Sequence, residues 1–579
     1  MATHANSDGE HVDRRDYLRH IGAGATGVAL AGCIGGDGSG TDSSTTGGGA
    51  EETETDSDTE TQAPETKRSD DTLVIGMGSA AETLDPHKAN RLPEQEIITS
   101  FAEPLFRDDP EGEPTPHLLA DWEQNDDATR FDFVVEEGIT FHDGEPFNAE
   151  AAVWNLNRIR ENSPVASDIS AENIATIEAT GDYEFYMEYN DPFPLLPRRL
   201  TIWNFSMVSP TAVEEAGEEF GQSTVVGTGP YQFDNWDRGT AVTFTRYEDY
   251  EWGPDFLTNQ GPGYAGEFRF EHHPEGSTLR NELTNGDVHG SKSVLLSYAQ
   301  EIENHDNTQL ARKQFTRQAY VCPNCQSEPF TETDVRKAVV HAINKEAVME
   351  STVSGEGYPI WNCVTPNHSN SLGAERSREL GQEFNPDRAR ELLENAGWTN
   401  SQQGETRSRD GQDLTIDFFT FTIEREKRVG RAVAPMLKQV GFDVNLEILE
   451  AGTLYDQVES GEHDLLVMAL GGTYGLGWLE NALHSSRWFT EGGCCNFSIW
   501  ENEEFDQLID DTKTEPDADV RAENVREAQQ IMLEEAPVAP IFGYNKIFGY
   551  KNEVGGVENW KEHQWWPVEP YAQRMELFL

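Results

Sequence analysis

The chain has 579 residues, more than one hydrophobic core can serve, since single cores stop growing at about 250 to 300 residues. It carries 105 acidic and 43 basic residues, a formal net charge of −62, yet 36% of its residues are hydrophobic. This hydrophobic content excludes a disordered acidic chain, and the charge makes nucleic acid a poor candidate partner. Lysine supplies only 12 of the basic residues, and the acids are spread along the whole chain. The composition therefore indicates a surface adapted to high salt, as in a haloarchaeal protein, rather than an acidic patch for a cationic partner.

The first 70 residues are predicted to lie outside the fold. Residues 13–19 (DRRDYLR) are typical of a twin-arginine export signal, and the apolar stretch 21–31 is too short to span a bilayer. Residues 30–33 (LAGC) resemble a lipobox, which predicts lipid attachment at Cys33. Residues 34–70 are acidic and rich in Gly, Ser and Thr, so we expect a flexible tether. An export signal over 1–33 and this tether predict a protein anchored by lipid to the outer face of the cell membrane.

From residue 71 onward, strand and helix patterns alternate, which predicts an α/β fold. Apolar runs and period-two alternation predict strands over 72–76, 131–135, 414–421 and 443–449. Apolar faces at helical spacing predict helices over 147–160, 335–348 and around 431–440. A further helix is expected to begin at Asn385 and Pro386, a capping residue followed by a first-turn proline.

Several blocks in this region resemble one known family. The most specific block is 137–150 (EGITFHDGEPFNAE). The others are 83–87 (TLDPH), 101–106 (FAEPLF), 116–122 (PHLLADW), 226–231 (VGTGPY), 329–346, 385–398 and 535–537. Together, in this order, they resemble the extracellular family 5 solute-binding proteins, the oligopeptide and dipeptide receptors of ABC importers.

The resemblance implies a two-lobed, type II periplasmic-binding-protein-like fold with the inserted domain of the peptide-binding class. Lobe one would comprise residues 71–105, 225–315 and 535–579, the inserted domain 106–224, and lobe two 316–534. Such a protein is a monomer without a cofactor, which closes on a small solute and delivers it to permease and ATPase subunits. Residues 227–230 (GTGP) are expected to let the chain cross sharply between the lobes.

The resemblance also implies where the ligand lies. Main-chain contacts are expected just after the TLDPH block, at Asn90, Arg91 and Leu92. In lobe two the family holds a peptide's amino group with an acid, which is missing at the expected place in 469–480. Either Glu480 substitutes for it, or the solute is a sugar, a metal chelate or a peptide with uncharged ends. The other candidate ligand residues in this stretch are Gly472, Thr473, Tyr474 and Trp478, whose two rings either stack on the solute or belong to the core.

Catalytic motifs are missing from the sequence, so we expect no enzyme. It contains no GxxxxGK[ST] phosphate loop, no HExxH helix and no GxSxG elbow, which disfavours a secreted hydrolase. Two alternatives to an importer receptor for peptides stay open: a receptor that signals to a membrane sensor, and a nickel- or sugar-specific member of the same family.

The cysteines leave a further choice open. Cys322 and Cys325 form a CxxC, and with Cys494 and Cys495 they suit either disulfides across lobe two or a zinc site, with disulfides favoured outside the membrane. A CxxC redox enzyme is a third option, and Cys363 has no assigned role. Sequons at Asn204, Asn367 and Asn496 permit glycosylation without establishing it.

Overall fold

The computed structural model describes residues 67–294, 296–366, 368, 370–381, 383–400, 405–471, 474–488, 495–558 and 574–579. Arg68–Leu579 forms a compact unit distinct from Met1–Lys67. The predicted export signal, the lipid-attachment residue Cys33 and nearly all of the tether lie outside the described residues. Among the helices in the described ranges, none is long and apolar enough to cross a membrane.

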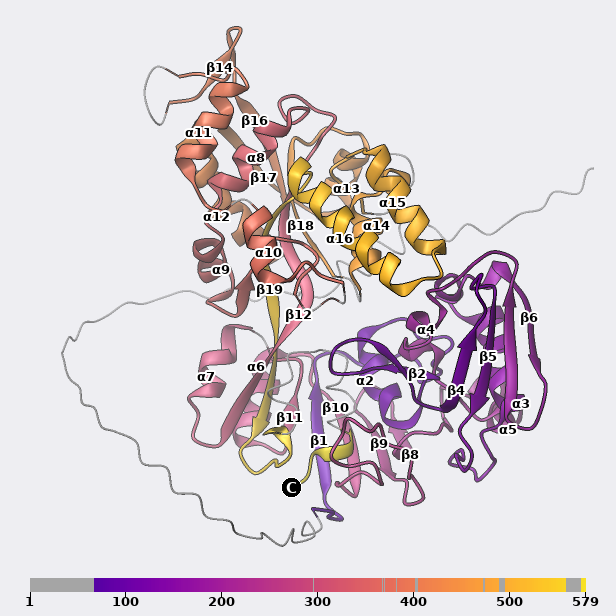
Figure 1. Ribbon diagram of the computed structural model, residues 1–579. Coiled ribbons are helices and arrows are strands. Elements are labelled where there is room, and N and C mark those ends of the chain that lie inside the picture. The colour runs from indigo at the N-terminus through magenta and orange to yellow at the C-terminus, as the bar shows by residue number, and fades with distance from the viewer. Residues whose placement is uncertain are drawn as a thin grey trace, which may run out of the picture. The chain divides into compact units, whose positions relative to one another are not determined.

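A large mixed β-sheet runs through the compact unit (Figure 1). Its strands follow the order β17-β16-β18-β12-β19-β11-β1-β10-β9-β8, with β13 paired to β19 beside this path. They are β1 (Thr72–Met77), β8 (Tyr231–Asp237), β9 (Ala241–Arg246), β10 (Glu267–His272), β11 (Gly290–Ser291), β12 (Thr308–Pro323), β13 (Gly357–Pro359), β16 (Thr415–Phe421), β17 (Asp443–Leu449), β18 (Leu465–Leu470) and β19 (Ala539–Lys551). The predicted strands at 72–76, 414–421 and 443–449 are confirmed, and the last two pair in parallel.

Two long antiparallel strands, β12 and β19, join the two halves of this sheet (Figure 1). Thr308 lies opposite Lys551 at one end of the pair, and Val321 lies opposite Ala539 at the other. The register shifts between Gln314 and Gln318, and we call this segment the crossover. The half with β1 and β8 to β11 is lobe one, and the half with β16 to β18 is lobe two.

Helices cover the sheet in both lobes. Lobe one carries α2 (Leu92–Phe101), α6 (Gly276–Asn285) and α7 (Ala299–Glu303). Lobe two carries α8 (Thr333–Ala342), α9 (Lys345–Val353), α10 (Gly373–Leu380), α11 (Pro386–Asn395), α12 (Glu424–Val440), α13 (Ala451–Glu459), α14 (Gly475–Leu483), α15 (Glu503–Thr514), α16 (Ala518–Glu535) and the small hairpin β14 (Ser408–Arg409) and β15 (Gln412–Asp413). The predicted helix at Asn385 is confirmed, since the Asn385 side chain accepts a hydrogen bond from the Arg388 amide.

The prediction of a single helix over 335–348 is wrong. The chain forms α8 and α9 instead, because Asn344 leaves the helical conformation and its side chain caps α9 by accepting a hydrogen bond from the Ala347 amide. The apolar face that suggested one helix is real, since Val335, Val339 and Val348 are all buried in the same core.

The inserted domain is built on a four-stranded antiparallel sheet in the order β4-β5-β7-β6. Its elements are β2 (Phe106–Asp108), β3 (Pro114–Pro116), β4 (Leu119–Gln124), β5 (Arg130–Val135), α3 (Ala149–Asn162), β6 (Ile174–Ala179), β7 (Glu184–Tyr189) and α4 (Leu196–Arg199). The next helix, α5 (Pro210–Ala216), packs against the core of lobe one. Phe131, Phe133 and Val135 alternate with exposed residues, as predicted for a half-exposed strand. Short 3₁₀ turns complete the chain at Ala166–Ile169, Ala171–Asn173, Trp203–Phe205, Gly217–Glu219, Leu296–Tyr298 and Ser485–Arg487.

Lobe one, lobe two and the inserted domain each have their own hydrophobic core. At two places, residues pack in a different core from the one that the predicted domain ranges imply. Ile541 and Tyr544 pack in the core of lobe two, although 535–579 is predicted as lobe one, because β19 serves both lobes in turn. Val208 and Phe220 pack in the core of lobe one, although they fall in the range predicted for the inserted domain.

Residues 227–230 lie against the end of α2 rather than between the lobes. A Cβ atom on Gly227 would lie 2.2 Å from the Phe101 carbonyl oxygen, and one on Gly229 would lie 2.7 Å from the Phe101 carbonyl carbon. The Gly229 amide donates to the Phe101 carbonyl over 2.9 Å. These glycines are therefore explained by close backbone approach, not by a turn between lobes.

Candidate functional site

The parallel strands of both lobes run toward the crossover. In lobe two, Leu470 at the end of β18 lies opposite Gln318. In lobe one, β11 runs from Gly290, opposite Tyr550, to Ser291, opposite Gly549, and so toward the crossover. Ligands of open α/β sheets bind outside the carboxyl ends of the strands. The crossover is therefore where a binding site is expected.

Three helices of lobe two begin at this edge. α12, α13 and α14 follow β16, β17 and β18 directly along the chain. None of the three has a side chain that caps its first amide groups. Free amides and the helix dipole both favour negative charge at a helix N-terminus. This edge of lobe two is therefore suited to an anionic group.

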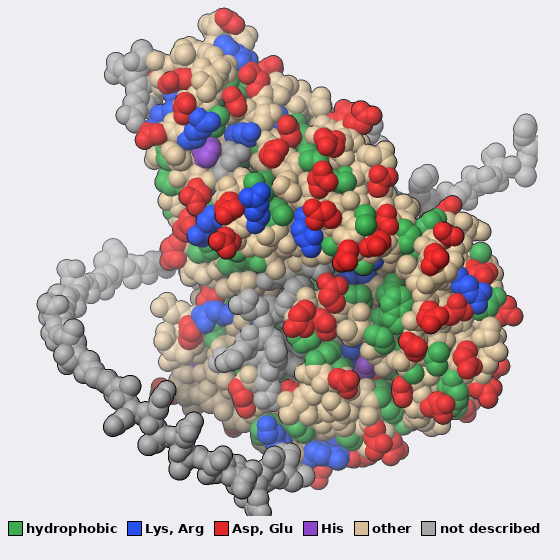
Figure 2. Space-filling model, in the orientation of Figure 1, with side chains coloured by type: hydrophobic (Ala, Val, Ile, Leu, Met, Phe, Trp, Pro, Cys, Tyr) green, Lys and Arg blue, Asp and Glu red, His purple; other side chains and the backbone are tan. Residues whose placement is uncertain are grey.

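Lysine is rare in the chain but gathers at the crossover. Acidic side chains are spread over the visible face of the molecule, and basic ones are few (Figure 2). Lys313 on β12 and Lys546 on β19 are directly opposite in the antiparallel register, so their side chains share one face. The Nζ atoms of Lys292, just after β11, and of Lys546 each lie 3.9 Å from a carboxylate oxygen of Glu96 on α2. The crossover thus concentrates positive charge.

Two arginines lie on the lobe-two side of the crossover. Oε1 of Glu426 accepts a 2.8 Å hydrogen bond from Nε of Arg425 and lies 4.0 Å from Nη2 of Arg317. The Arg425 guanidinium is 5.3 Å from the centre of the Tyr544 ring. Burial lowers the pKa of Arg317, and the positive charge of Arg425 lowers it further. Two guanidiniums therefore share one carboxylate here.

This cluster is incomplete as a hydrogen-bond network. Nε of Arg317, Oε2 of Glu426 and the hydroxyl of Tyr544 are buried and have no hydrogen-bond partner among the described residues. Burial raises the pKa of Tyr544, so its hydroxyl stays neutral. Buried polar atoms are nearly always paired in native proteins. We call Arg317, Arg425, Glu426 and Tyr544 the crossover cluster, and it offers unpaired donors and an acceptor to a ligand.

The predicted ligand residues of lobe one lie at the start of α2. Asn90 is exposed, and Arg91 forms an ion pair with Glu82. Leu92 is 63% exposed, the most exposed large hydrophobic side chain among the described residues. Glu94, one turn further along, is buried, and burial raises its pKa.

The predicted aromatic residues of lobe two are buried within the protein. Trp478 is 1% exposed and packs edge to face on Tyr320, with 5.7 Å between ring centres. Its surroundings are those of a core residue, although its Nε1 has no hydrogen-bond partner in the described ranges. Tyr474 is also buried, and the Arg199 guanidinium lies 4.9 Å from its ring centre. Gly472 and Thr473 lie outside the described residues.

Glu480 is already balanced by cations of its own lobe. Its Oε1 accepts a 2.9 Å hydrogen bond from Arg487 and lies 3.4 Å from Nζ of Lys513. Burial acts to raise the pKa of Glu480, but the hydrogen bond from Arg487 and the charge of Lys513 bring it below its usual value. This environment gives Glu480 no free charge for a ligand's ammonium group.

The cysteines do not form the predicted bridges across lobe two. Cys322, Cys325 and Cys363 are buried free thiols, whereas Cys495 is disulfide-bonded and Cys494 lies outside the described residues. Burial raises the pKa of Cys325 to about 12, which keeps it a neutral thiol. Within the described ranges, no group of three or more His, Cys, Asp or Glu side chains is placed to hold a metal ion.

Two of the predicted sequons are inaccessible in the folded protein. The Asn204 side chain is buried and donates to the Ala89 carbonyl over 2.6 Å. The Asn496 side chain is buried and donates to the carbonyls of Leu483, His484 and Trp500. Asn367 lies outside the described residues.

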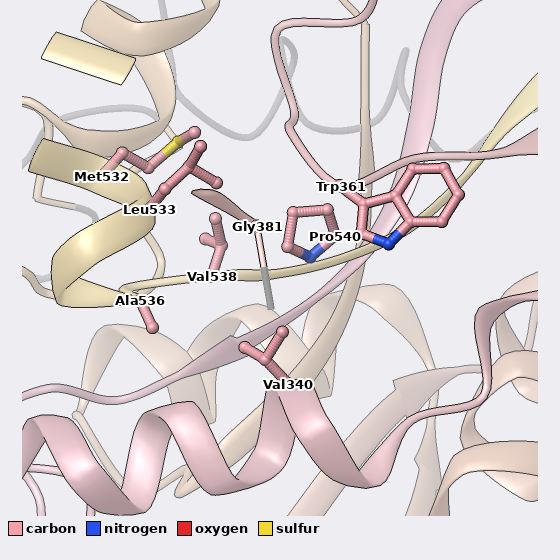
Figure 3. Close-up of a pocket in the computed structure, with 8 residues that line it drawn as sticks. All are labelled: Val340, Trp361, Gly381, Met532, Leu533, Ala536, Val538 and Pro540. Carbon is pink, nitrogen blue, oxygen red and sulfur yellow. The ribbon is translucent and has the colours of Figure 1, made fainter. Parts of the chain in front are cut away.

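A small pocket on lobe two is not a candidate binding site (Figure 3). Its free space is about 10 Å³, the scale of one water molecule. The lining is apolar and consists of Val340, Trp361, Gly381, Met532, Leu533, Ala536, Val538 and Pro540.

Known proteins share both the sequence pattern and the fold. Residues 113–485 match the model of the bacterial extracellular solute-binding proteins, family 5. The glutathione-binding protein GsiB of Escherichia coli K12 is 26% identical over 491 residues, covering 84% of this chain and 91% of GsiB. The ABC transporter substrate-binding protein CtaP of Listeria monocytogenes has the same fold, with a TM-score of 0.73 at 18% identity, over 88% of this chain and 100% of CtaP. DppA of Helicobacter pylori, solved with the peptide STSA, gives a TM-score of 0.64 at 20% identity, over 89% and 99% of the two chains.

The chain belongs to family 5 of the bacterial extracellular solute-binding proteins. This confirms the family that the sequence blocks predict, and the mixed α/β fold of the peptide-binding class.

Proposed function

We propose that this chain is the solute receptor of an ABC importer and that the crossover cluster holds a peptide-like solute. The observation that carries the proposal is the set of unpaired buried atoms on Arg317, Glu426 and Tyr544. They lie where the strands of lobe two end, which is where ligands of such sheets bind. GsiB, described as glutathione-binding, and DppA, solved with a peptide, support a peptide-like solute.

The cluster suits a ligand that carries both a carboxylate and a hydrogen-bond donor. Nε of Arg317 and the guanidinium of Arg425 are donors for a carboxylate, and charge-assisted bonds of this kind are the strongest available. Oε2 of Glu426 accepts from an amide or ammonium group, and the Tyr544 hydroxyl serves either role. A short peptide presents these groups side by side.

Binding at the crossover couples the solute to lobe closure. The arginines belong to lobe two, whereas Lys292 follows β11 of lobe one. A solute that touches both groups binds the closed arrangement more tightly than the open one, and so shifts the population toward closure. Leu92, exposed at the start of α2, is a further contact that we propose from lobe one.

The family places such receptors outside the cytoplasm. We propose that this one is exported by the arginine pair in 13–19 and held at the membrane by a lipid on Cys33, as a monomer suited to high salt. Replacing Cys33 by Ser should release the protein from the membrane fraction into the medium, and retention in that fraction would contradict lipidation.

The binding site is tested by calorimetry on the purified chain at constant high salt. The probes are glutathione and trialanine, together with any solute that is carried through purification and identified by mass spectrometry. Arg425→Gln should weaken binding at least tenfold, which is about 1.4 kcal/mol. The matched control is Arg428→Gln on the same helix, because Arg428 is half exposed and pairs with Glu424. Equal affinity in wild type and Arg425→Gln would place the solute elsewhere.

A further inference from the structure

A second cavity lies between the inserted domain and lobe two. It encloses about 290 Å³, near the lower end of the volumes found for small-molecule sites. β4 and α4 of the inserted domain form one wall, and α14 and α16 of lobe two form the other. It shares no lining residue with the crossover cluster.

Part of the wall from the inserted domain is apolar and preformed, and Glu113, Gln124 and Arg198 supply its polar part. Pro194 and Pro197 have fixed φ angles, so this part of the wall has little freedom to collapse. Trp122 also lines the cavity, and its ring is held by an edge-to-face contact with Phe106 at 5.5 Å between ring centres. A rigid apolar wall lowers the entropy cost of binding.

Tyr474 forms the facing aromatic surface, at the start of α14. The Arg199 guanidinium of the inserted domain lies 4.9 Å from its ring centre, within the range of a cation–π contact. This contact fixes the ring and ties lobe two to the inserted domain beside the cavity.

Arg521 on α16 supplies a charge to the cavity. Its Nη1 donates to the carbonyls of Glu515 and Pro516 over 2.8 and 2.7 Å, but it forms no ion pair with any described residue. Glu113, which also lines the cavity, is paired with Arg198 instead, at 3.4 Å. Burial lowers the pKa of Arg521, although the negative charges of Glu515, Asp517 and Glu113 act to raise it.

We propose that this cavity binds a small carboxylate with an apolar or aromatic body. The carboxylate pairs with Arg521, and the body lies between Trp122 and Tyr474. Because the walls belong to two domains, the bound molecule holds the inserted domain against lobe two. This inference does not depend on the identity of the solute at the crossover cluster. The carboxylate comes either from a free molecule or from a side group of the transported solute.

The test uses the full purified chain and N-acetyl-phenylalanine as the probe, in calorimetric titrations. Wild type should bind one equivalent saturably, and Trp122→Ala and Arg521→Gln should each weaken binding at least tenfold. Arg521→Lys, which keeps the charge, should recover part of the loss. The neutral N-acetyl-phenylalaninamide should bind at least fivefold more weakly than the acid. Arg526→Gln is the matched control on α16, since the Arg526 side chain is 41% exposed and pairs with Glu523.

Three results would overturn the proposal. They are no saturable binding to folded wild type at millimolar probe, an affinity unchanged by Arg521→Gln, or an affinity lost in Arg425→Gln, which would place the probe at the crossover cluster. Thermal melts of each variant show whether a loss of binding is a loss of folding. A competition experiment between the probe and the solute carried through purification then shows whether the carboxylate comes from that solute or from a free molecule. Competition identifies the carboxylate as part of that solute, and independent binding identifies a free molecule.

Discussion

Glu103 and Glu426 are both buried carboxylates beside arginines, but their oxygens are used differently. Glu103 accepts hydrogen bonds from Tyr250 at 2.8 Å, Trp252 at 3.0 Å and Thr228 at 3.2 Å, and pairs with Arg107. Glu426 bonds through Oε1, and its Oε2 has no partner in the described ranges.

The difference separates a structural cluster from a binding one. Burial acts to raise the pKa of Glu103, but the charges of His117 and Arg107 and the hydrogen bond from Tyr250 hold it at about 2. The hydrogen-bonding capacity of the Glu103 carboxylate is thus satisfied by other residues of the protein, and these contacts connect the inserted domain to lobe one. The crossover cluster, by contrast, keeps donor and acceptor atoms that a ligand can pair with. We therefore expect the free energy of unfolding to depend on buried groups that are paired within the protein, such as Glu103. The affinity for the solute should depend on the crossover cluster.

Lowering the pH should produce the largest difference between the effect on stability and the effect on solute affinity. Burial lowers the pKa of His87, His142 and His463 from 6.5 to about 4, with Arg158 contributing at His87. Their contribution to the free energy of unfolding is full above pH 6.5 and is lost progressively as the pH falls from 6.5 to about 4. Between pH 7 and pH 5, each histidine should remove about 2 kcal/mol of stability.

The measurement is denaturant unfolding at pH 7 and pH 5 at constant salt. In His142→Gln, the difference between the two pH values should shrink by about 2 kcal/mol, the share of one histidine. Solute affinity should change less than threefold over this range, because the crossover cluster contains no histidine. A stability independent of pH would show that these histidines are not buried as neutral groups.

Removing the two carboxylates should have unequal effects. Glu103→Ala leaves Arg107 and His117 buried without their anion, so it should lower the free energy of unfolding by about 3 to 5 kcal/mol. Glu426→Ala should cost about 1 kcal/mol or less, because the side chains of Arg425 and Arg317 are 40% and 28% exposed. Equal losses, measured by denaturant unfolding, would mean that both clusters are structural.

Two tyrosine variants, each lacking only a hydroxyl, should have the smallest effects on stability and should still distinguish a structural residue from a binding residue. Tyr250→Phe removes a bonded hydroxyl and leaves Glu103 with one donor fewer, which should cost about 1 to 3 kcal/mol. Tyr544→Phe removes a hydroxyl without a partner in the described ranges, so unfolding should be unchanged within about 0.5 kcal/mol. Only Tyr544→Phe should weaken solute binding, by several-fold. A destabilised Tyr544→Phe with normal affinity would contradict a binding role for this residue.

Local chemistry made much of the fold predictable. The cap at Asn385 and the alternation in β5 act between near neighbours, so the sequence alone locates these elements. The same reasoning missed the break at Asn344, where a capping side chain outweighs a continuous apolar face. It also assigned the whole C-terminal segment to one lobe, because no local pattern reveals that β19 serves two cores.

The candidate site was hidden for a different reason. Arg317, Arg425 and Tyr544 are about a hundred residues apart from one to the next and meet only through the sheet and α12. Glycines near Trp478 suggested an open pocket, but the ring fills the core beside Tyr320. One signal in the sequence could have helped: lysine is scarce, so Lys313 and Lys546 on predictable strands stand out.

The position of β19 also constrains the order in which the protein can be assembled. It lies between β12 and β11, in the middle of the sheet, yet among the described strands it is the last to be synthesised. Until the chain has been made past Lys551, β11 lacks a neighbour on one side and the two halves of the sheet have no ladder to join them. A nascent chain that ends before β19 therefore exposes open strand edges in both lobes, which is the form most prone to pair with other chains.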